Sequence, residues 1–304
     1  MFHFCVGKTS GKTSVLHVDF DCIILDAWSA KLLLNEIFSL YYGKDVKFPR
    51  ISFMNYMRLK TDKGDLEAEE YWKEKVKNMP SFPKLNYQKK FAEVQNVRFD
   101  RIECDFSFIE TQRLYQKIKN YHFTPAAVIS TIFMKTLAQY SETPGLSINV
   151  TLFNRQLLHE DVNGILGEFT NNAVISYQEK TDSLLDAIRA TQEQKWRLVQ
   201  YRKFEGSNIL KMLSSGRAGK AIMPVVFTCM LEGNVSKVTK KRYSFKEEYA
   251  ISQTPQVVLD HHVRDDLGYL KISWDYIIDI FDKQYITDIF GAYVNNIKKF
   301  MEKY

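Results

Sequence analysis

Residues 16–29 read LHVDFDCIILDAWS and decide the fold, because an alternating apolar strand here runs directly into a helix. Alternate residues from Val18 onward share one face of an extended chain, and the run 22–25 is apolar enough to be buried on both faces. Asp21 and Asp26 are therefore expected at the edge of a core. A carboxylate there is costly unless it is paired or hydrogen-bonded, so the two acids predict either a partner or a catalytic task.

The composition of the chain is that of a globular protein. Its 304 residues are long for one hydrophobic core and predict two subdomains. The formal net charge is +6, and the densest basic run, Lys237–Arg242, is interrupted by Val238 and Thr239. This pattern predicts a solvated loop, with an acidic carrier protein as the alternative partner. It argues against nucleic acid, whose binding needs a larger basic face with interleaved aromatic residues.

The cysteines and the N-terminal residues indicate the compartment. The four cysteines are scattered without a Cys-x-x-Cys spacing, which predicts neither a zinc site nor a disulfide framework. No apolar run is long enough to span a bilayer, and Met1–Ser14 lacks the layout of a signal peptide. We therefore predict a cytoplasmic protein without a metal and without a membrane contact.

The residues before the strand, Gly7–Thr13, end in Gly-Lys-Thr like a phosphate-binding loop. The earlier glycine of that loop would fall on Val6, and no apolar strand precedes it. A flexible polar leader is predicted in place of a nucleotide site.

Helices are predicted where apolar residues recur at helical spacing after a capping residue. Ser29 is the expected N-cap of the first helix, which stops at Gly43. Ser107 and Glu110 form the capping box of another helix, and Thr124 caps one that is apolar on most sides. The predicted helices are 30–42, 66–79, 107–121, 124–140, 183–203, 208–213 and 282–303.

Strands are predicted where polar and apolar residues alternate between turn signals. These stretches are 91–106, 147–155, 223–231 and 252–260, followed by a hairpin turned at Asp265–Gly268. In the second of them, Asn149 and Arg155 lie on the more polar face.

Three positions of the opening stretch carry a family resemblance. The pattern Asp-x-x-x-x-Asp-x-x-Ser, formed by Asp21, Asp26 and Ser29, resembles the signature of heterocyclization domains of nonribosomal peptide synthetases. Ordinary condensation domains carry His-His-x-x-x-Asp-Gly at this place. Asp21-Cys22 stands here where the two histidines would be, and Ala27 replaces the glycine, which favours the cyclizing branch.

Further segments resemble the same family in the same order along the chain. Met79–Leu85 is similar to its proline-spaced connector, and Ile165–Asn171 to its Gly-Asp-Phe-Thr segment, with Glu168 in place of aspartate. Met223–Leu231 is similar to Pro-Val-Val-Phe-Thr-Ser-x-Leu, and residues 252–260 match Ser-Gln-Thr-Pro-Gln-Val-x-Leu-Asp residue for residue. This last match is the most specific of these signals, because its polar order is not forced by secondary structure.

The resemblance implies a chloramphenicol-acetyltransferase-like, two-lobed fold of the α/β (α+β) type, with mixed sheets and flanking helices. Residues 1–101 would form a partial N-terminal lobe with the paired-aspartate motif and a linker, and residues 102–304 the C-terminal lobe. Family members have a substantial part before the paired aspartates, so the first lobe is expected to be incomplete. A tunnel between the lobes would admit two phosphopantetheine arms.

The family's reaction joins two carrier-bound substrates and then closes a ring. The amine of a cysteine, serine or threonine attacks an upstream thioester, and its side chain then attacks the new amide with loss of water. Ring closure needs a group that moves protons, because an amide is a poor electrophile. Asp260, at the end of its strand, is predicted to be that group with Thr228 as its partner, and the family's catalytic residues lie in these two motifs. The side-chain amides of Asn149 and Gln253 are candidates for holding the substrate.

The remaining motif residues are predicted to be structural. Asp26 is expected to pair with Arg155 and so to fix the two subdomains against each other. Asp21 and Ser29 belong to the same structural motif. The histidine pair 261–262 is predicted to be core or surface without a metal, since adjacent strand residues point to opposite faces.

No directly bound cofactor is expected, because the substrates of this family arrive on the 4'-phosphopantetheine of upstream and downstream peptidyl carrier proteins. Adjacent synthetase domains, adenylation domains above all, are the other expected partners. Two alternatives stay open. One is ordinary amide-forming condensation without ring closure, and the other is a truncated, non-catalytic module that only docks carrier proteins.

Overall fold

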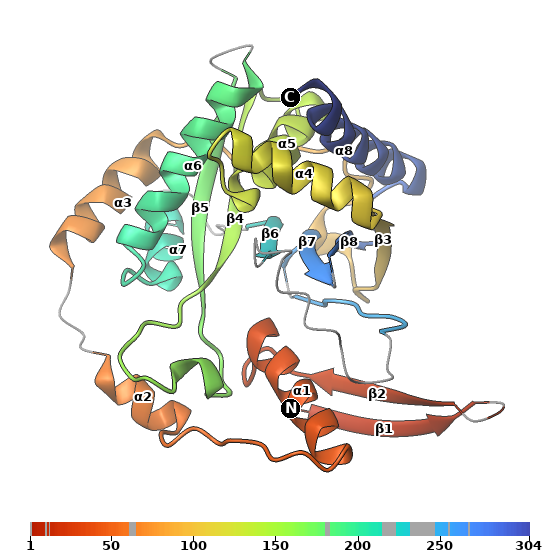
Figure 1. Cartoon of the computed structure of the whole chain (residues 1–304). Coiled ribbons are helices and arrows are strands. Elements are labelled where there is room, and N and C mark those ends of the chain that lie inside the picture. Colours follow the sequence, from red (N-terminus) through yellow and green to blue (C-terminus); the bar gives the residue numbers. More distant parts are fainter. Residues whose placement is uncertain are drawn as a thin grey trace. The chain divides into compact units, whose positions relative to one another are not determined.

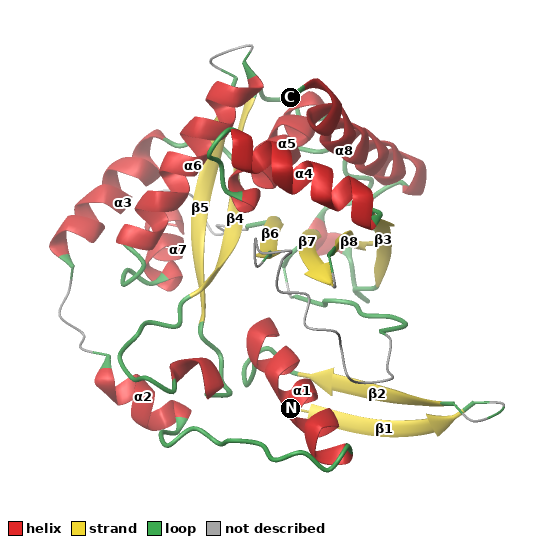
Figure 2. Cartoon of the chain, viewed as in Figure 1, coloured by secondary structure: helices red, strands yellow, loops and turns green. Residues whose placement is uncertain are grey.

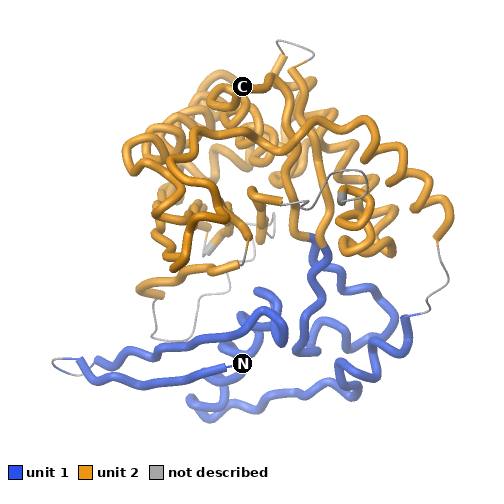
Figure 3. Tube along the Cα trace, turned by 180° about the vertical axis from the view of Figure 1, so that it is seen from behind, with its two compact units in different colours: residues 1–64, 152–171 blue, residues 65–151, 172–304 orange. Residues whose placement is uncertain are grey.

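The computed structural model describes residues 2–9, 11, 13–60, 65–179, 183–214, 223–231, 247–254, 256–266 and 268–304. The chain divides into two compact units, each discontinuous in sequence, as Figure 3 shows. Unit 1 comprises Met1–Gly64 and Leu152–Asn171, and unit 2 comprises Asp65–Thr151 and Asn172–Tyr304. The sequence predicted one boundary between two lobes, after residue 101. This division into lobes stays a prediction.

Unit 2 is built on a six-stranded mixed sheet (Figure 1). Its strands are β3 (Phe99–Asp105), β4 (Gly145–Phe153), β5 (Thr170–Gln178), β6 (Val225–Met230), β7 (Leu259–Asp266) and β8 (Tyr269–Ile277). Their order is β3-β8-β7-β6-β4-β5. The pairs β4–β6 and β6–β7 are parallel, whereas β8 is antiparallel to both β7 and β3. Strands from distant parts of the sequence are therefore brought side by side.

Two helices of unit 2 pack on one face of this sheet. Its described helices are α3 (Leu66–Asn78), α4 (Phe108–Asn120), α5 (Pro125–Gln139), α6 (Leu184–Gln200), α7 (Gly206–Ser214) and α8 (Lys283–Lys303), together with the 3-10 turn η1 (Phe91–Glu93). The ring centroids of Phe133 on α5 and His261 on β7 are 4.6 Å apart, and Trp274 on β8 stacks on Tyr293 of α8. All four side chains are fully buried, so this face is the hydrophobic core of unit 2.

Local capping chemistry explains where two of these helices begin. Ser107 accepts a hydrogen bond from the backbone N–H of Glu110, whose carboxylate accepts one from the N–H of Ser107. Thr124 accepts a hydrogen bond from the N–H of Ala127, in front of Pro125 at the first helical position. Both predicted helix starts are confirmed.

The described part of unit 1 contains a two-stranded sheet, two helices and the segment Leu152–Asn171, which connects β4 to β5. Its elements are β1 (Phe2–Lys8), β2 (Ser14–Phe20), α1 (Ala27–Tyr41), α2 (Phe53–Leu59) and the 3-10 turn η2 (Val162–Gly164), and Figure 2 shows them by type. Its core is small. It contains the buried side chains of Tyr56, Val162, Ile165 and Phe169.

The opening stretch differs from its prediction at three points. Gly7 and Lys8, the first residues of the predicted flexible leader 7–13, belong to β1, and residues 2–8 pair with β2 along its whole length. A strand therefore precedes the Gly-Lys-Thr run, contrary to the prediction. β2 ends at Phe20 and its residues are exposed or half-buried, so the stretch is not a strand buried on both faces. The helix begins at Ala27 with Asp26 as its N-cap, so Ser29 is its third residue and not its cap.

Two other predicted strands are shorter than expected. The alternation over residues 91–106 contains the η1 turn, and β3 begins only at Phe99. Residues 252–258 precede β7, where Gln256 has a φ of 66° and so breaks an extended run. The basic run Lys237–Arg242 lies outside the described residues. None of the helices within the described ranges combines the length and the apolar character needed to cross a bilayer.

Candidate active site

The face of the six-stranded sheet opposite α5 and α8 carries polar side chains. The strand register pairs Thr228 with His262, and Asp260 with Asp275. Residues paired in register point to the same side of a sheet, as do residues two apart on one strand. We call this surface the polar face; its members include Arg101, Asn149, Thr151, Thr228, Asp260, His262, Ser273 and Asp275.

Asp260 is the second residue of β7, so it lies at the start of a strand and not at its end as predicted. The residue is only 4% exposed. Its Oδ2 lies 3.3 Å from Nε2 of His262, whereas its buried Oδ1 accepts no hydrogen bond from the described residues. Because buried polar atoms nearly always have partners, Oδ1 is a candidate acceptor for a bound substrate.

Thr228 lies on the strand next to Asp260 and points to the same side of the sheet. Its Oγ1 is 2.9 Å from Oγ1 of Thr151 on β4, and the residue is buried. The register places Thr228 directly opposite His262, two residues further along the strands than Asp260. The two side chains share one surface as predicted, but within the described residues the Thr228 hydroxyl bonds to Thr151 and not to Asp260.

The two predicted positioning amides lie in different places. Asn149 on β4 is buried, and its Nδ2 donates to Oδ1 of Asn172 over 3.3 Å. The Oδ1 of Asn149 is itself buried and has no donor in the part of the chain that the structure describes. Gln253 is exposed in the segment before β7 and is not part of the polar face. The fold thus brings Asn149, but not Gln253, onto the surface of Thr228 and Asp260.

Three charged residues that sequence reasoning missed complete the polar face. Arg101 on β3 donates from Nε and Nη2 to the two carboxylate oxygens of Asp275, over 2.6 and 2.7 Å. The backbone N–H of Ser252 also donates to Oδ2 of Asp275, over 2.7 Å. Nε2 of His262 lies 3.3 Å from Oδ2 of Asp260 and 3.6 Å from Oδ2 of Asp275. Both are charge contacts and not hydrogen bonds, because this nitrogen has no hydrogen-bond partner within the described residues. Their alternation with buried apolar residues of β3, β7 and β8 is the signal that could have indicated them.

The neighbouring charges control the ionisation of His262. Burial alone would lower the pKa of this imidazole, but the carboxylates of Asp260 and Asp275 raise it above its ordinary value. On the opposite face, burial without a carboxylate lowers the pKa of His261 well below the usual range. Within the described residues, no group of three or more histidine, cysteine, aspartate or glutamate side chains is arranged to hold a metal ion. Carboxylate, imidazole and hydroxyl groups, which can all transfer protons, meet on the polar face.

Asp26, Ser29 and Arg155 form a buried cluster in unit 1. Nη2 of Arg155 donates to Oδ1 of Asp26 over 3.3 Å and to Oγ of Ser29 over 2.7 Å. The predicted ion pair between Asp26 and Arg155 is confirmed. Both residues belong to unit 1, so the pair ties the start of α1 to the chain after β4, whereas the sequence predicted that it would join two subdomains.

Asp21 lies outside this cluster and is exposed. Its Oδ1 accepts a hydrogen bond from the backbone N–H of Ile23 over 3.0 Å, in the turn after β2. The prediction placed Asp21 at the edge of a core. It is wrong because the strand ends one residue earlier and the chain turns there, where a short carboxylate stabilises the turn.

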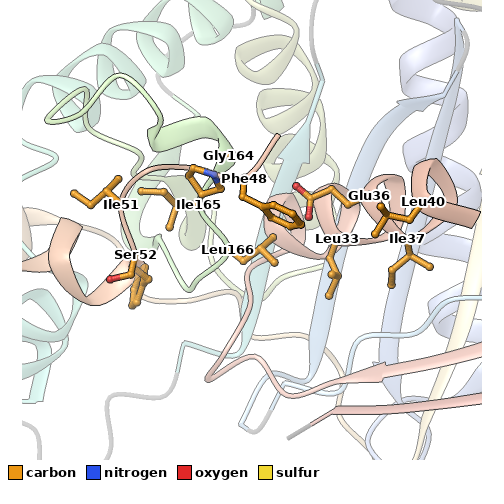
Figure 4. Close-up of a pocket in the computed structure, with 12 residues that line it drawn as sticks. Leu33, Glu36, Ile37, Leu40, Phe48, Ile51, Ser52, Gly164, Ile165 and Leu166 are labelled. Carbon is orange, nitrogen blue, oxygen red and sulfur yellow. The ribbon is translucent and has the colours of Figure 1, made fainter. Parts of the chain in front are cut away.

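An apolar pocket of about 340 Å³ lies in unit 1, and Figure 4 shows its lining. It is lined by Leu33, Glu36, Ile37, Leu40, Phe48, Pro49, Ile51, Ser52, Phe53, Gly164, Ile165 and Leu166. Burial raises the pKa of Glu36, the carboxylate in this lining. None of the predicted site residues lines the pocket, whose α1 side is formed by Leu33, Glu36, Ile37 and Leu40.

Comparison with known proteins identifies the family. The description "Condensation domain" belongs to the family whose profile matches residues 1–304. This chain belongs to the condensation-domain family. Condensation domains of nonribosomal peptide synthetases are acyltransferases that form amide bonds.

The curated relatives of this condensation domain are much longer proteins. It is 27% identical over 300 residues to bacitracin synthase 1 of Bacillus licheniformis. This alignment covers 95% of the chain and 6% of the synthase. It is 26% identical over 315 residues to phenyloxazoline synthase MbtB of Mycobacterium tuberculosis. This second alignment covers 98% of the chain and 22% of the synthase. The condensation domain thus spans a small fraction of the length of these relatives.

A solved structure confirms the predicted fold. The cyclization-docking bidomain of the EpoB nonribosomal peptide synthetase from Sorangium cellulosum aligns with a TM-score of 0.88 and 25% identity. The alignment covers 99% of this chain and 63% of that one. The condensation domain therefore has the chloramphenicol-acetyltransferase-like α/β fold, as the resemblance of its motifs implied.

Proposed function

We propose that this condensation domain is a heterocyclization domain, which forms an amide and then closes it to a thiazoline or oxazoline. The observation that carries the proposal is the placement of Thr228 and Asp260 on one buried polar face. The pattern of Asp21 and Asp26 supports it, with Asp21-Cys22 in place of the two histidines of ordinary condensation domains. Similarity to a phenyloxazoline synthase and to a cyclization bidomain points the same way.

The first half-reaction is amide formation. The amine of a carrier-bound cysteine, serine or threonine attacks the carbonyl carbon of an upstream thioester. A C–N bond forms, the C–S bond breaks, and the upstream carrier thiol departs with the proton that the amine loses. The buried Oδ1 of Asn149 would accept a hydrogen bond from the N–H of the new amide and so hold it for the next step.

The second half-reaction is ring closure with loss of water. Asp260 takes the proton of the side-chain thiol or hydroxyl as its sulfur or oxygen bonds to the amide carbon. The former carbonyl oxygen leaves as water, carrying that proton and the proton of the amide nitrogen, while a C=N bond forms. The Thr228 hydroxyl would donate to the developing oxyanion, and donors of this kind are worth most in a dry site such as this one.

The proposal also names partners and a location. The acyl donor and the amino acid would arrive on the 4'-phosphopantetheine of upstream and downstream carrier proteins, with adenylation domains as neighbours. The domain would bind no cofactor of its own and would act in the cytoplasm.

Mass spectrometry of the carrier-bound product tests the proposal. The 304-residue chain is mixed with an upstream carrier that bears an acyl thioester and a downstream carrier loaded with cysteine. Asp260→Asn is expected to form the amide but to lower ring closure by ~10²–10⁴-fold, the usual contribution of a general acid–base group. Asp288→Asn, which changes an exposed carboxylate on α8, is the matched control.

The outcomes separate the alternatives. A wild-type product that has lost one water relative to the amide supports heterocyclization. An amide that never loses water indicates ordinary condensation, and no product from both loaded carriers indicates a module that only docks them.

A further inference from the structure

We infer that His262 is a positioning residue for ring closure, because its imidazole ring lies against one oxygen of the Asp260 carboxylate on the buried polar face and holds that carboxylate in place through the positive charge of the ring. The inference rests on the function proposed above. It assigns a role to a residue that lies outside both sequence motifs of the proposed catalytic pair.

The strand geometry brings His262 to Asp260. Both residues are on β7, two positions apart, and so point to the same side of the sheet. Nε2 of His262 lies 3.3 Å from Oδ2 of Asp260, and the two side chains are 18% and 5% exposed. At this distance and burial, a positive charge acts strongly on a carboxylate because little water screens the pair.

The other carboxylate of the polar face already has a cation. Asp275 accepts two hydrogen bonds from Arg101 and one from the backbone of Ser252. Among the described residues, the ion pairing of Asp260 involves His262 alone. The charge of Asp260 is therefore balanced by an imidazole, which is positive only when it is protonated, whereas that of Asp275 is balanced by a guanidinium that stays charged.

Asp260 and Asp275 are the neighbouring groups that raise the pKa of His262, against burial and the charge of Arg101. The charged groups that face it from β7, β8, β3 and the segment before β7 are Asp260, Arg264, Asp275, Lys271, Arg101, Glu103 and Glu247. Arg264 is paired with Glu247, and Lys271 with Glu103. Burial opposes the charge on the imidazole, but Asp260 and Asp275 outweigh it and raise the pKa of His262.

The two half-reactions need this pair to different degrees. Ring closure depends on an Asp260 carboxylate whose oxygen faces the thiol or hydroxyl that it deprotonates. Amide formation does not need this carboxylate, because a thioester reacts readily with an amine. Loss of the imidazolium should therefore slow ring closure and leave amide formation nearly unchanged. This selectivity distinguishes a positioning role from a structural one, because a misfolded domain would lose both activities.

A pH profile of the two steps tests the inference. His262→Gln keeps a hydrogen-bonding side chain of similar length and removes the charge. At neutral pH, this variant is expected to close the ring about ten- to a hundredfold more slowly, a part of the ~10²–10⁴-fold carried by the acid–base group itself. His17→Gln, the same change at an exposed position of β2, is the control.

The shape of the profile gives the second readout. The imidazolium loses its proton as pH rises through the raised pKa of His262. The rate of ring closure by the wild-type domain should therefore fall above that pH. The pH profile of His262→Gln should lack this fall in rate. The carrier-bound nucleophile titrates equally in both proteins, so the comparison isolates His262. Parallel profiles, or equal loss of amide formation and ring closure, would overturn the inference.

An NMR titration of the histidine rings tests the charge pairing without turnover. The His262 signal, assigned as the one absent from His262→Gln, should titrate above the ordinary value of ~6.5 in wild type and at lower pH in Asp260→Asn. An unshifted midpoint in Asp260→Asn would refute the pairing. If wild type forms the amide but never the ring, the proposed function fails, and this titration still decides whether the pair exists.

Discussion

At the scale of single residues, His261 and His262 illustrate how one strand serves two environments. Nε2 of His261 lies 2.8 Å from the hydroxyl of Tyr293 within the aromatic core, whereas His262 faces Asp260 and Asp275. Alternation along a strand predicts that the two rings face opposite sides. Which side carries the carboxylates depends on the pairing of β7 with β6 and β8, which involves residues far apart in the sequence.

Arg155 is the residue whose loss is expected to destabilise unit 1 most. Its side chain is 5% exposed, and its Nη1 donates to the carbonyl oxygens of Val162 and Ile165 over 2.8 Å each. Arg155→Ala would leave Asp26 buried without its cation, which typically costs about 3–5 kcal/mol. Urea denaturation followed by fluorescence measures the change in the free energy of unfolding.

Arg50→Ala is the matched control for this prediction. Arg50 also forms ion pairs, with Glu160 and Asp161, but its side chain is 67% exposed. Surface pairs in water contribute little, so this variant should unfold at nearly the wild-type urea concentration. Equal destabilisation by the two substitutions would show that burial of Asp26 is not what makes its pair important.

At the scale of elements, the capping box of α4 predicts a pH effect. The hydrogen bond from Ser107 is the largest cause that lowers the pKa of Glu110. A carboxyl group with a lowered pKa in the folded state contributes stability above its unfolded pKa, and this contribution is lost as pH falls through the folded value. Ser107→Ala should cost about 1 kcal/mol at neutral pH and should lose less stability on acidification than wild type.

Ser52→Ala separates capping from ionisation. Ser52 caps α2 by accepting from the N–H of Asn55, which has no charge to titrate. This variant should lose stability without a change in its dependence on acid pH, measured by urea denaturation at several pH values. An identical acid dependence of Ser107→Ala and wild type would contradict the role assigned to Glu110.

The elements also show why some boundaries were predictable and others were not. The starts of α4 and α5 depend on hydrogen bonds between residues three apart, which the sequence displays directly. The start of β7 depends on its pairing with β6, from Leu259 onward, and on the left-handed backbone of Gln256. For this reason the sequence placed Asp260 wrongly at the end of its strand, and its role as a site residue stays a prediction.

At the scale of the whole molecule, stability is expected to differ between the two sheets. β1 and β2 form a two-stranded sheet in which Phe2 and Val6 are each 67% exposed, whereas β7 and β8 belong to the six-stranded sheet over a buried core. Two strands alone are marginal in water, so the amides of residues 2–8 should exchange with deuterium much faster than those of residues 269–277.

Hydrogen exchange followed by mass spectrometry measures this difference. Peptides from β1 should exchange early and peptides from β8 last, at a pH where the domain is folded. Similar protection of the two peptides would contradict this prediction. It would mean that further contacts stabilise the β1–β2 hairpin despite the exposure of its side chains.

The sequence by itself determined the family, the order of the motifs, the choice of Asp260 and Thr228, and the ion pair of Asp26 with Arg155, because these follow from local patterns and from a motif order that survives in the linear chain. Tertiary structure alone decided that His262, Asp275 and Arg101 share one face of the sheet with Thr228 and that Gln253 does not lie on its strands. Those outcomes depend on which strands become neighbours and in which register. Such pairing is set by packing between distant segments, and local sequence does not encode it.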